Sequence, residues 1–315
     1  MKVLVTGGGG FTGMVVVNRL LARGDAVIVF DIGVSAPLQA LIDNGADVTA
    51  VVGDITSLPH IAQTFKQNRP DAVVHLAAAV GAGPTMGNPW RVVEVNVGGT
   101  LHLMETMRLY DIKRMIFLST EETWGDMNLV NTETDYQVPF LPYGISKLTV
   151  EHFCNTYNRL HGLECIGLRT SWIYSPGLPR PRPPNTFIDA ALEGRSFHMT
   201  EGAETVVDFT HMYDIVQGIL RALDHPKHPH HVYNVGSGVA TSFQEVVDIV
   251  KELVPGADIS TAPGPYHFPG GVQMPKKGAL DNTRARETFG YEPEFPDIRR
   301  GLENYIEQVR QEGSP

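Results

Sequence analysis

The chain has 315 residues and a formal charge of -10 at pH 7, and 42% of its residues are hydrophobic while 19% are charged. Such a chain can bury a substantial core, so the composition excludes a disordered protein. The acidic balance, without a long run of Lys or Arg, argues against nucleic acid or a membrane surface as a partner, since both require basic patches. No apolar run reaches the ~20 residues of a membrane-spanning helix. Met1 leads directly into the first predicted strand and leaves no room for a signal sequence, so we expect a cytoplasmic protein.

The amino terminus predicts a nucleotide-binding unit. Lys2 to Thr6 is an apolar run of strand length, a run of glycines from Gly7 follows it, and residues 14–23 have a helical pattern. Glycines in such a turn let the backbone approach a pyrophosphate, and the amides at the start of the helix bind its charge. A second strand, residues 26–30, ends at Asp31. A carboxylate there can accept hydrogen bonds from both ribose hydroxyls of NAD and repels the 2′-phosphate of NADP.

Further strands alternate with helical stretches as far as residue 174, and we expect them at residues 47–53, 72–77, 114–119 and 165–173. The alternation predicts an α/β fold, a Rossmann-type doubly wound parallel sheet that binds ligands at its carboxyl edge. The proline-rich stretch from Ser175 to Pro184 cannot be helical, and we expect it to cross to a smaller, discontinuous substrate-binding lobe. From this lobe Val232 to Val235 returns to the sheet as a strand. The expected parts are an NAD-binding domain of residues 1–174 plus about 206–240, and a lobe of about 175–205 and 241–315.

Tyr143 and Lys147 lie four residues apart on a predicted helix, so they share one face. A phenol titrates near pH ~10 on its own, and a neighbouring ammonium favours phenolate and lowers this pKa. The pair can therefore take a proton from an alcohol or give one to a carbonyl.

The cysteines and the histidine-rich patch of the chain indicate no chemistry of this kind. Cys154 and Cys165 lack CxxC spacing, and we expect both to be reduced core residues. A histidine-rich patch has no carboxylates at metal spacing, so we expect a surface turn and no metal site; it consists of His225, His228, His230 and His231.

Together these motifs resemble the extended short-chain dehydrogenase/reductase family, the group of NAD-dependent sugar epimerases and dehydratases. The family's TGxxGxxG motif matches Thr6 to Gly13, its acidic strand end matches Asp31, and its Asp after the third strand matches Asp54. The resemblance covers nearly the whole chain, and further matching stretches are His75–Ala78, Asn96–Thr100, Ser119–Thr120, Leu168–Arg169, Asp208–Asp214 and Tyr233–Gly236.

The resemblance implies NAD as the cofactor, a sugar-like small molecule as the substrate, and a homodimer. It also implies a cofactor site that consists of Gly7, Gly10, Phe11, Thr12, Gly13, Asp31, Asp54, Ile55, Leu76, Ala77, Ala78, Asn96, Tyr143 and Lys147.

The end of the fifth strand is where the resemblance implies catalysis. Thr120 aligns with the Ser or Thr that holds the reacting hydroxyl, and Ser119 is the neighbouring alternative. In the sugar-nucleotide dehydratases the next two residues are acids that eliminate water, and Glu122 matches the one that abstracts a proton. Oxidation to a ketone acidifies the adjacent C–H, so a carboxylate in a dry site can remove that proton. A structural or solvated role stays open for both Glu121 and Glu122, because relatives with other reactions also carry Glu here.

The substrate end departs from the family pattern. Many relatives have an Arg that grips the diphosphate where this chain has Val207, and the run from Ser260 to Gln273 contains no Arg or Lys. A diphosphate needs charge-assisted donors. Arg180 and Arg182 could supply an anion site for one carboxylate, or they could face solvent.

The sequence thus predicts an NAD-dependent enzyme that oxidises a secondary alcohol on a sugar or sugar-like polyol, with Tyr143 as base, Lys147 as its partner and Thr120 as the clamp of the hydroxyl. Return of the hydride would make it an epimerase or dehydratase, which Glu122 favours. Release of NADH would make it a net dehydrogenase of a small hydroxy compound or sugar acid, which Val207 favours. A catalytically idle NAD-binding sensor is a third alternative.

Overall fold

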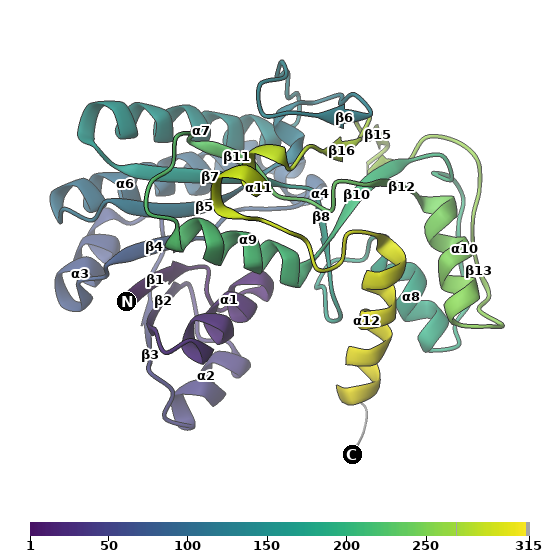
Figure 1. The fold of residues 1–315 in the computed structure, drawn as a ribbon, viewed down its shortest axis with the longest axis horizontal. Helices are drawn as coiled ribbons and strands as arrows, with labels where there is room; N and C mark the ends of the chain where they lie inside the picture. The colour runs from purple at the N-terminus through teal and green to yellow at the C-terminus, as the bar shows by residue number, and fades with distance from the viewer. Residues whose placement is uncertain (269, 313–315) are drawn as a thin grey trace.

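The computed structural model describes residues 1–268 and 270–312, and its largest element is a seven-stranded sheet (Figure 1). All its neighbouring strands are parallel. The order across the sheet is β11 (Val232–Asn234), β7 (Glu164–Thr170), β5 (Arg114–Thr120), β4 (Ala72–His75), β1 (Lys2–Thr6), β2 (Ala26–Asp31) and β3 (Val48–Val52). The chain leaves β1 toward β3 and later returns to its other side with β4, so the crevice between β1 and β4 is the switch point of the sheet.

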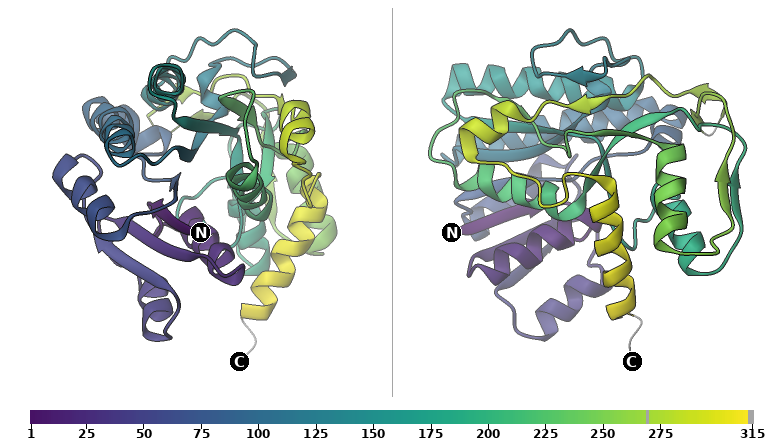
Figure 2. Two further views of the ribbon diagram at one scale, coloured as in Figure 1. Left: turned by 60° about the vertical axis from the view of Figure 1, so that its left-hand side comes forward. Right: turned by 45° about the vertical axis from the view of Figure 1, so that its right-hand side comes forward.

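Helices cover both faces of this sheet, which explains why strands such as β4 are buried along their whole length. One core lies between the sheet and α1 (Phe11–Ala22), α2 (Ala36–Asp43), α9 (Met212–Asp224) and α11 (Thr283–Phe289). A second core lies on the other face, under α3 (Leu58–Asn68), α6 (Gly99–Leu109) and α7 (Pro142–His161). The two views of Figure 2 show the sheet between these helix layers. The predicted doubly wound α/β fold is confirmed.

A smaller lobe stands beside the carboxyl edge of the sheet, at the right of Figure 1. Its three-stranded sheet consists of β12 (Ala240–Ser242), β10 (Val206–His211) and β8 (Trp172–Tyr174), and its helices are α8 (Asn185–Leu192), α10 (Phe243–Leu253) and α12 (Ile298–Glu312). Short pairs join β9 (Phe197–Met199) to β13 (Ile259–Thr261) and β14 (His267–Phe268) to β15 (Val272–Gln273). Trp172, Phe209 and Phe243 pack together in the lobe's core.

The structure differs from the sequence analysis at the expected strand of residues 165–173. This stretch forms two strands, because β7 ends at Thr170 and β8 begins at Trp172 in the other sheet. The aromatic side chain of Trp172 belongs to the core of the smaller lobe, and burying it there draws the chain away from the large sheet. Val207 on β10 is fully buried in the same core. The boundary between the two lobes stays a prediction.

Several short elements lie around the carboxyl edge of the large sheet. They are α4 (Ala82–Gly87), α5 (Pro89–Val92), the π-helical turn η1 (Val93–Gly98), the 3-10 turn η2 (Glu121–Thr123), and the parallel pair β6 (Val130–Asn131) and β16 (Ala279–Leu280). No helix among the described residues is long and apolar enough to cross a membrane.

Candidate active site

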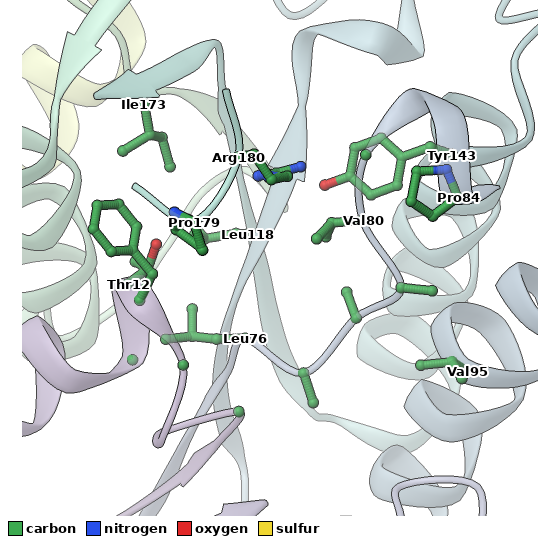
Figure 3. A pocket seen from close by; sticks show the side chains of 18 of the residues that line it. Thr12, Leu76, Val80, Pro84, Val95, Leu118, Tyr143, Ile173, Pro179 and Arg180 are labelled. Carbon is green, nitrogen blue, oxygen red and sulfur yellow. The ribbon is translucent and has the colours of Figure 1, made fainter. Parts of the chain in front are cut away.

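A cleft of about 760 Å³ runs along the carboxyl edge of the sheet, between the glycine turn after β1 and the proline-rich loop after β8 (Figure 3). The strand ends of β2, β4, β5 and β7 and the start of α7 contribute residues to its walls. The cleft therefore lies where a doubly wound sheet binds its ligand. Most predicted site residues line it, and they are Gly7, Gly10, Phe11, Thr12, Gly13, Asp31, Asp54, Ile55, Leu76, Ala77, Ala78, Ser119, Glu121, Glu122, Tyr143, Lys147, Arg180 and Arg182.

The glycine turn has a shape that only glycine permits. Gly7 has a φ of 70°, and a Cβ added to it would lie 2.7 Å from the backbone nitrogen of Ala77. A Cβ on Gly13 would collide with the carbonyl oxygen of Gly7. The turn can therefore lie flat against the end of β4 and present its backbone to the cleft, as binding of a pyrophosphate requires.

Asp31 faces the cleft at the end of β2 and is fixed by the backbone. Its Oδ2 accepts a hydrogen bond from the Gly9 amide at 3.0 Å, and its Oδ1 accepts one from the Ile32 amide at 2.7 Å. Each oxygen keeps a free lone pair, so the carboxylate can still accept from the two hydroxyls of a ribose. The donor set of this edge thus fits NAD.

Asp54 lies further along the same wall. The Thr56 amide donates to its Oδ1 at 2.9 Å and the Thr56 hydroxyl at 2.8 Å, and these bonds hold the pKa of Asp54 below its ordinary value. Arg91, which the sequence analysis did not single out, lines the cleft beside it, with Nη2 3.5 Å from Asp54 Oδ2. Nothing in the local sequence around Arg91 marks it as a cleft residue.

Asn96 does not line the cleft, although the family resemblance implied contact with the cofactor. Its amide side chain accepts from the Ala79 nitrogen at 2.7 Å, donates to the Ala79 oxygen at 3.1 Å, and donates to Ser146 Oγ at 3.0 Å. It is buried and fully engaged. Asn96 therefore fixes the loop after β4 against α7, and acts on the cleft through that loop.

Tyr143 and Lys147 lie one turn apart on α7, as predicted, with Lys147 Nζ 5.7 Å from the centre of the Tyr143 ring. Lys147 Nζ donates to the Leu118 carbonyl oxygen at 2.7 Å, and burial lowers the pKa of Lys147 to about 8. Burial, and then the carboxylates of Glu122 and Glu121, raise the pKa of the Tyr143 phenol. The two side chains alone therefore do not lower the pKa of Tyr143 in the way that the sequence analysis expected. NAD, when bound, supplies the hydride acceptor and the positive charge of its oxidised ring.

The Thr120 hydroxyl is engaged by its own loop. It donates to Glu121 Oε2 at 3.0 Å and accepts from the Glu122 amide at 3.2 Å, and Thr120 is not among the described residues that line the cleft. This hydroxyl thus donates to the carboxylate next in sequence, and the role of Thr120 as the clamp of a substrate hydroxyl stays a prediction. Ser119 lines the cleft, but its hydroxyl donates to the buried Glu151.

Glu122 is the cleft carboxylate with the most perturbed environment. Burial raises the pKa of Glu122 to about 7, Glu121 adds to the rise, and Lys277, Arg182 and Arg180 oppose it. One of its oxygens, Oε2, is buried and has no hydrogen-bond partner among the described residues. A carboxyl that titrates near neutrality and faces a cleft can work as a general acid or base.

Arg180 and Arg182 both enter the cleft from the proline-rich loop, and Figure 3 shows Arg180 near the Tyr143 hydroxyl. The Arg182 guanidinium lies over the Trp172 ring at 5.0 Å and donates from Nη2 to the Ile173 carbonyl at 2.7 Å. Burial, and then Arg180, lower the pKa of Arg182 to about 10. Its Nε is buried without a partner among the described residues. Two cations thus meet beside the reactive phenol, where an anionic substrate group would satisfy them.

Three other residues at or near the cleft were not predicted as site residues by the sequence analysis. Tyr266 and Phe268, from the segment around β14, line the cleft opposite the sheet. Lys277 is completely buried and lies 3.3 Å from Glu121, which the sequence could not show because the two residues are far apart along the chain. Among the described residues, no group of three or more His, Cys, Asp or Glu is placed to hold a metal ion.

These features define an NAD-binding enzyme of the short-chain dehydrogenase/reductase type. The profile of the NAD dependent epimerase/dehydratase family matches residues 3–236, and the chain belongs to this family. The expected family, cofactor and enzyme class are therefore confirmed.

Three known proteins illustrate the range of the family. The chain is 30% identical to dTDP-glucose 4,6-dehydratase 1 of Escherichia coli, over 98% of this chain and 94% of that protein. Its fold matches UDP-glucose 4-epimerase of Thermotoga maritima, solved with UDP-glucose, with a TM-score of 0.86 and 30% identity over the full length of both chains. MoeE5, solved with UDP-glucuronic acid and NAD, has a TM-score of 0.86 and 26% identity and covers 99% of this chain and 100% of its own.

Proposed function

We propose that this protein uses NAD to oxidise a secondary alcohol of a sugar or sugar-like polyol that carries an anionic group. The observation that supports this proposal is the meeting of Tyr143, Glu122 and the two loop arginines, Arg180 and Arg182, at one end of a cleft whose other end fits NAD. A matched phenol and ammonium serve alcohol oxidation, and a pair of guanidinium groups serves a carboxylate or phosphate.

We assign the roles of the site residues as follows. The turn from Gly7 to Gly13 binds the pyrophosphate of NAD, Asp31 binds the adenosine ribose, and the loop of residues 76–78 lines the nicotinamide end. Tyr143 Oη takes the proton of the substrate hydroxyl, and Lys147 stabilises the phenolate and lies toward the nicotinamide ribose. Arg180 and Arg182 hold the anionic group and orient the substrate.

After oxidation, we propose that Glu122 exchanges a proton with the carbon next to the new ketone, so that the hydride returns and the net reaction is epimerisation or dehydration. A buried carboxylate near neutrality suits this step, and the similar proteins include epimerases and a dehydratase. Turnover in D₂O should then place deuterium on a carbon of the product. The Glu122→Gln variant should lose this exchange and keep the first hydride transfer. Wild-type product without carbon-bound deuterium would remove Glu122 from this role.

Net dehydrogenation of a small hydroxy compound or sugar acid is the second candidate, and a specific observation favours it. Val207 replaces the expected phosphate-binding Arg and is fully buried away from the cleft. Among the described lining residues near Tyr143, Arg180 and Arg182 are the cations other than Lys147. A site with so few cations suits one carboxylate better than a nucleotide diphosphate, so UDP and dTDP should bind weakly in calorimetric titration. Micromolar binding of either would return the chain to sugar-nucleotide chemistry.

The deciding experiment is to purify the protein, determine whether NAD comes with it, and incubate it with NAD and a panel of free sugars, sugar acids and nucleotide sugars. Accumulating NADH identifies a dehydrogenase, and a changed sugar without NADH identifies an epimerase or dehydratase. Tight NAD binding without turnover of any panel member would favour the idle sensor, which the intact pair of Tyr143 and Lys147 argues against.

We further propose a homodimer in the cytoplasm. The dimer is supported by exposed apolar side chains on three segments that pack against each other, α5, η1 and α7; they are Trp90, Val93, Ile145 and Phe153. The two buried free cysteines, Cys154 and Cys165, fit a reducing compartment. Light scattering should give twice the chain mass, and Trp90→Glu should give the single chain mass with folding intact.

A further inference from the structure

Lys277 comes from the carboxyl-terminal part of the chain but lies against the turn η2, which contains Glu121 and Glu122 and is called the catalytic turn below. Its neighbours fix its backbone, because the Met127 amide donates to the Lys276 carbonyl at 2.9 Å. Gly278 packs closely against the loop that contains Met127 and Asn128, since a Cβ on Gly278 would collide with the Asn128 carbonyl oxygen. The segment therefore cannot drift away from the loop that follows the catalytic turn η2.

Within the described part of the chain, the ammonium of Lys277 has one close counter-charge. Its side chain is 0% exposed, its Nζ lies 3.3 Å from Glu121 Oε1, and it makes no hydrogen bond to any described residue. Removing an ammonium from water costs several kcal/mol, on the order given for buried ions, so the Glu121 carboxylate must offset this cost. Lys277 does not line the cleft and cannot touch a substrate there.

The other oxygen of Glu121 extends the contact to the catalytic turn. Glu121 Oε2 accepts the Thr120 hydroxyl at 3.0 Å, and Thr120 Oγ1 accepts the Glu122 amide at 3.2 Å. A chain of contacts thus runs from Lys277 through Glu121 and Thr120 to the backbone of Glu122. It fixes the turn that aims the Glu122 side chain into the cleft.

We propose that Lys277 is a positioning residue, which holds Glu121 in place through their ion pair and leaves Glu122 as the member of the acidic pair that carries the proton during the reaction. The role of Glu122 rests on the proposed function; the pairing of Lys277 with Glu121 does not. Two adjacent carboxyls can divide their roles when their environments differ, and among the described residues Glu121 has a buried cation at contact distance whereas Glu122 has none. The charged groups that act on Glu122 are Lys277, Glu121, Arg182 and Arg180, and its own charge acts on Tyr143.

A carbon NMR titration of the NAD-loaded protein, labelled at the glutamate carboxyls, tests the pairing without a substrate. The wild type should show one glutamate signal that titrates near pH 7, which Glu122→Gln removes. In Lys277→Met the Glu121 carboxyl, left buried without its cation, should take up a proton and give a second such signal, which an added Glu121→Gln removes. The exposed neighbour provides the control, since Lys276→Met should give no second signal. Absence of the second signal in Lys277→Met would overturn the proposal.

Turnover with the substrate found by the panel gives the second readout. Lys277→Met should lower kcat by roughly 10- to 100-fold with KM and NAD affinity unchanged, and Lys277→Arg should recover most of the loss. In a Glu121→Gln background, Lys277→Met should cost little more, because the pair acts as a unit. An equal loss in both backgrounds would contradict the proposal. If Lys277→Met alone does not fold, the double variant, which removes both buried charges, is compared with Glu121→Gln. Similar kcat values for these two support the proposal, and a large further loss in the double variant contradicts it. Absence of turnover with every panel member would refute the proposed function and leave the NMR result standing.

Discussion

At the cofactor end of the cleft the wall consists mainly of backbone and small side chains, whereas at the substrate end it includes larger polar and aromatic side chains, several of them from loops. Gly7 and Gly13 leave no space for a side chain, and the loop after β4 presents Ala77 and Ala78. At the other end, Arg180 and Arg182 extend from a proline-rich loop, and Lys277 reaches Glu121 from a distant segment.

The difference explains why the two ends diverge unequally from the family pattern. A backbone site depends on a turn that few sequences can adopt, so the glycines and Asp31 have the positions that the family motif implies. A site of loop side chains can change its ligand by single substitutions, because such side chains are not needed for the packing of the core. Membership of the family therefore predicts the cofactor, whereas the identity of the substrate depends on the side chains of the loops.

The largest expected effect is at the junction of the two ends. Tyr143→Phe removes the transferable proton and little packing, so turnover should fall by a factor on the order of 10² to 10⁴ while NAD affinity survives. Tyr157→Phe is the matched control, because Tyr157 lies on the same helix and donates to Glu105 instead of facing the cleft. Steady-state kinetics and NAD titration measure both variants. Near wild-type turnover in Tyr143→Phe would mean that another group moves the proton.

The substrate end should respond in KM. Arg182→Met keeps the apolar contact with Trp172 and removes a charge-assisted donor worth about 1.5 to 3 kcal/mol, so KM for an anionic substrate should rise roughly 10- to 100-fold with kcat within a few-fold. Arg195→Met, at an exposed ion pair with Glu193, should leave both constants unchanged. An unchanged KM in Arg182→Met would show that this guanidinium serves the fold of the loop.

The cofactor end of the cleft could be predicted from the sequence better than the substrate end. Local spacing was enough for the glycine turn, for Asp31 and for the pair Tyr143 and Lys147, since each depends on residues within one element. The break between β7 and β8 could not be predicted, because it depends on the distant aromatic partners of Trp172.

Long-range contacts also explain the remaining differences. Asn96 was expected in the cofactor site and lies behind it, because its partners at Ala79 and Ser146 come from other elements. The engagement of Thr120 depends on Glu121, whose orientation in turn depends on Lys277, more than 150 residues away. Such contacts leave no periodic signal in the sequence.

The cofactor end should show a smaller change in selectivity. Asp31→Ala removes the acceptor for the ribose hydroxyls and the charge that repels a 2′-phosphate, so the preference for NAD over NADP should shrink by roughly 10-fold or more. Asp43→Ala, on the exposed end of α2, provides the control. Calorimetric titration of both dinucleotides measures the ratio. An unchanged ratio would move the discrimination to another part of the cleft.

The smallest expected effect is on the free energy of unfolding. It reports on the buried carboxyl of Glu122, which lies where the two ends of the cleft meet. The pKa of Glu122 rises from 4.5 to about 7 on folding, so between these pH values the folded protein keeps a proton that the unfolded chain has lost. Stability from this group is therefore fully present at low pH and falls as the pH rises through this window. Glu122→Gln does not titrate, so its free energy of unfolding relative to the wild type should increase from pH 4.5 to pH 7.5 by on the order of 1 to 3 kcal/mol.

Urea denaturation of both proteins across this range measures the difference. His75 and His211, whose pKa values burial lowers to about 3 and about 4, act in the opposite direction, but they are present in both proteins and cancel in the comparison. Parallel stability curves would mean that the pKa of Glu122 is the same in the folded and the unfolded protein, so that Glu122 is ionised in the folded protein at neutral pH. The cations Lys277, Arg180 and Arg182 would then offset its burial, and the proton for a carbon-centred step would have to come from elsewhere in the cleft.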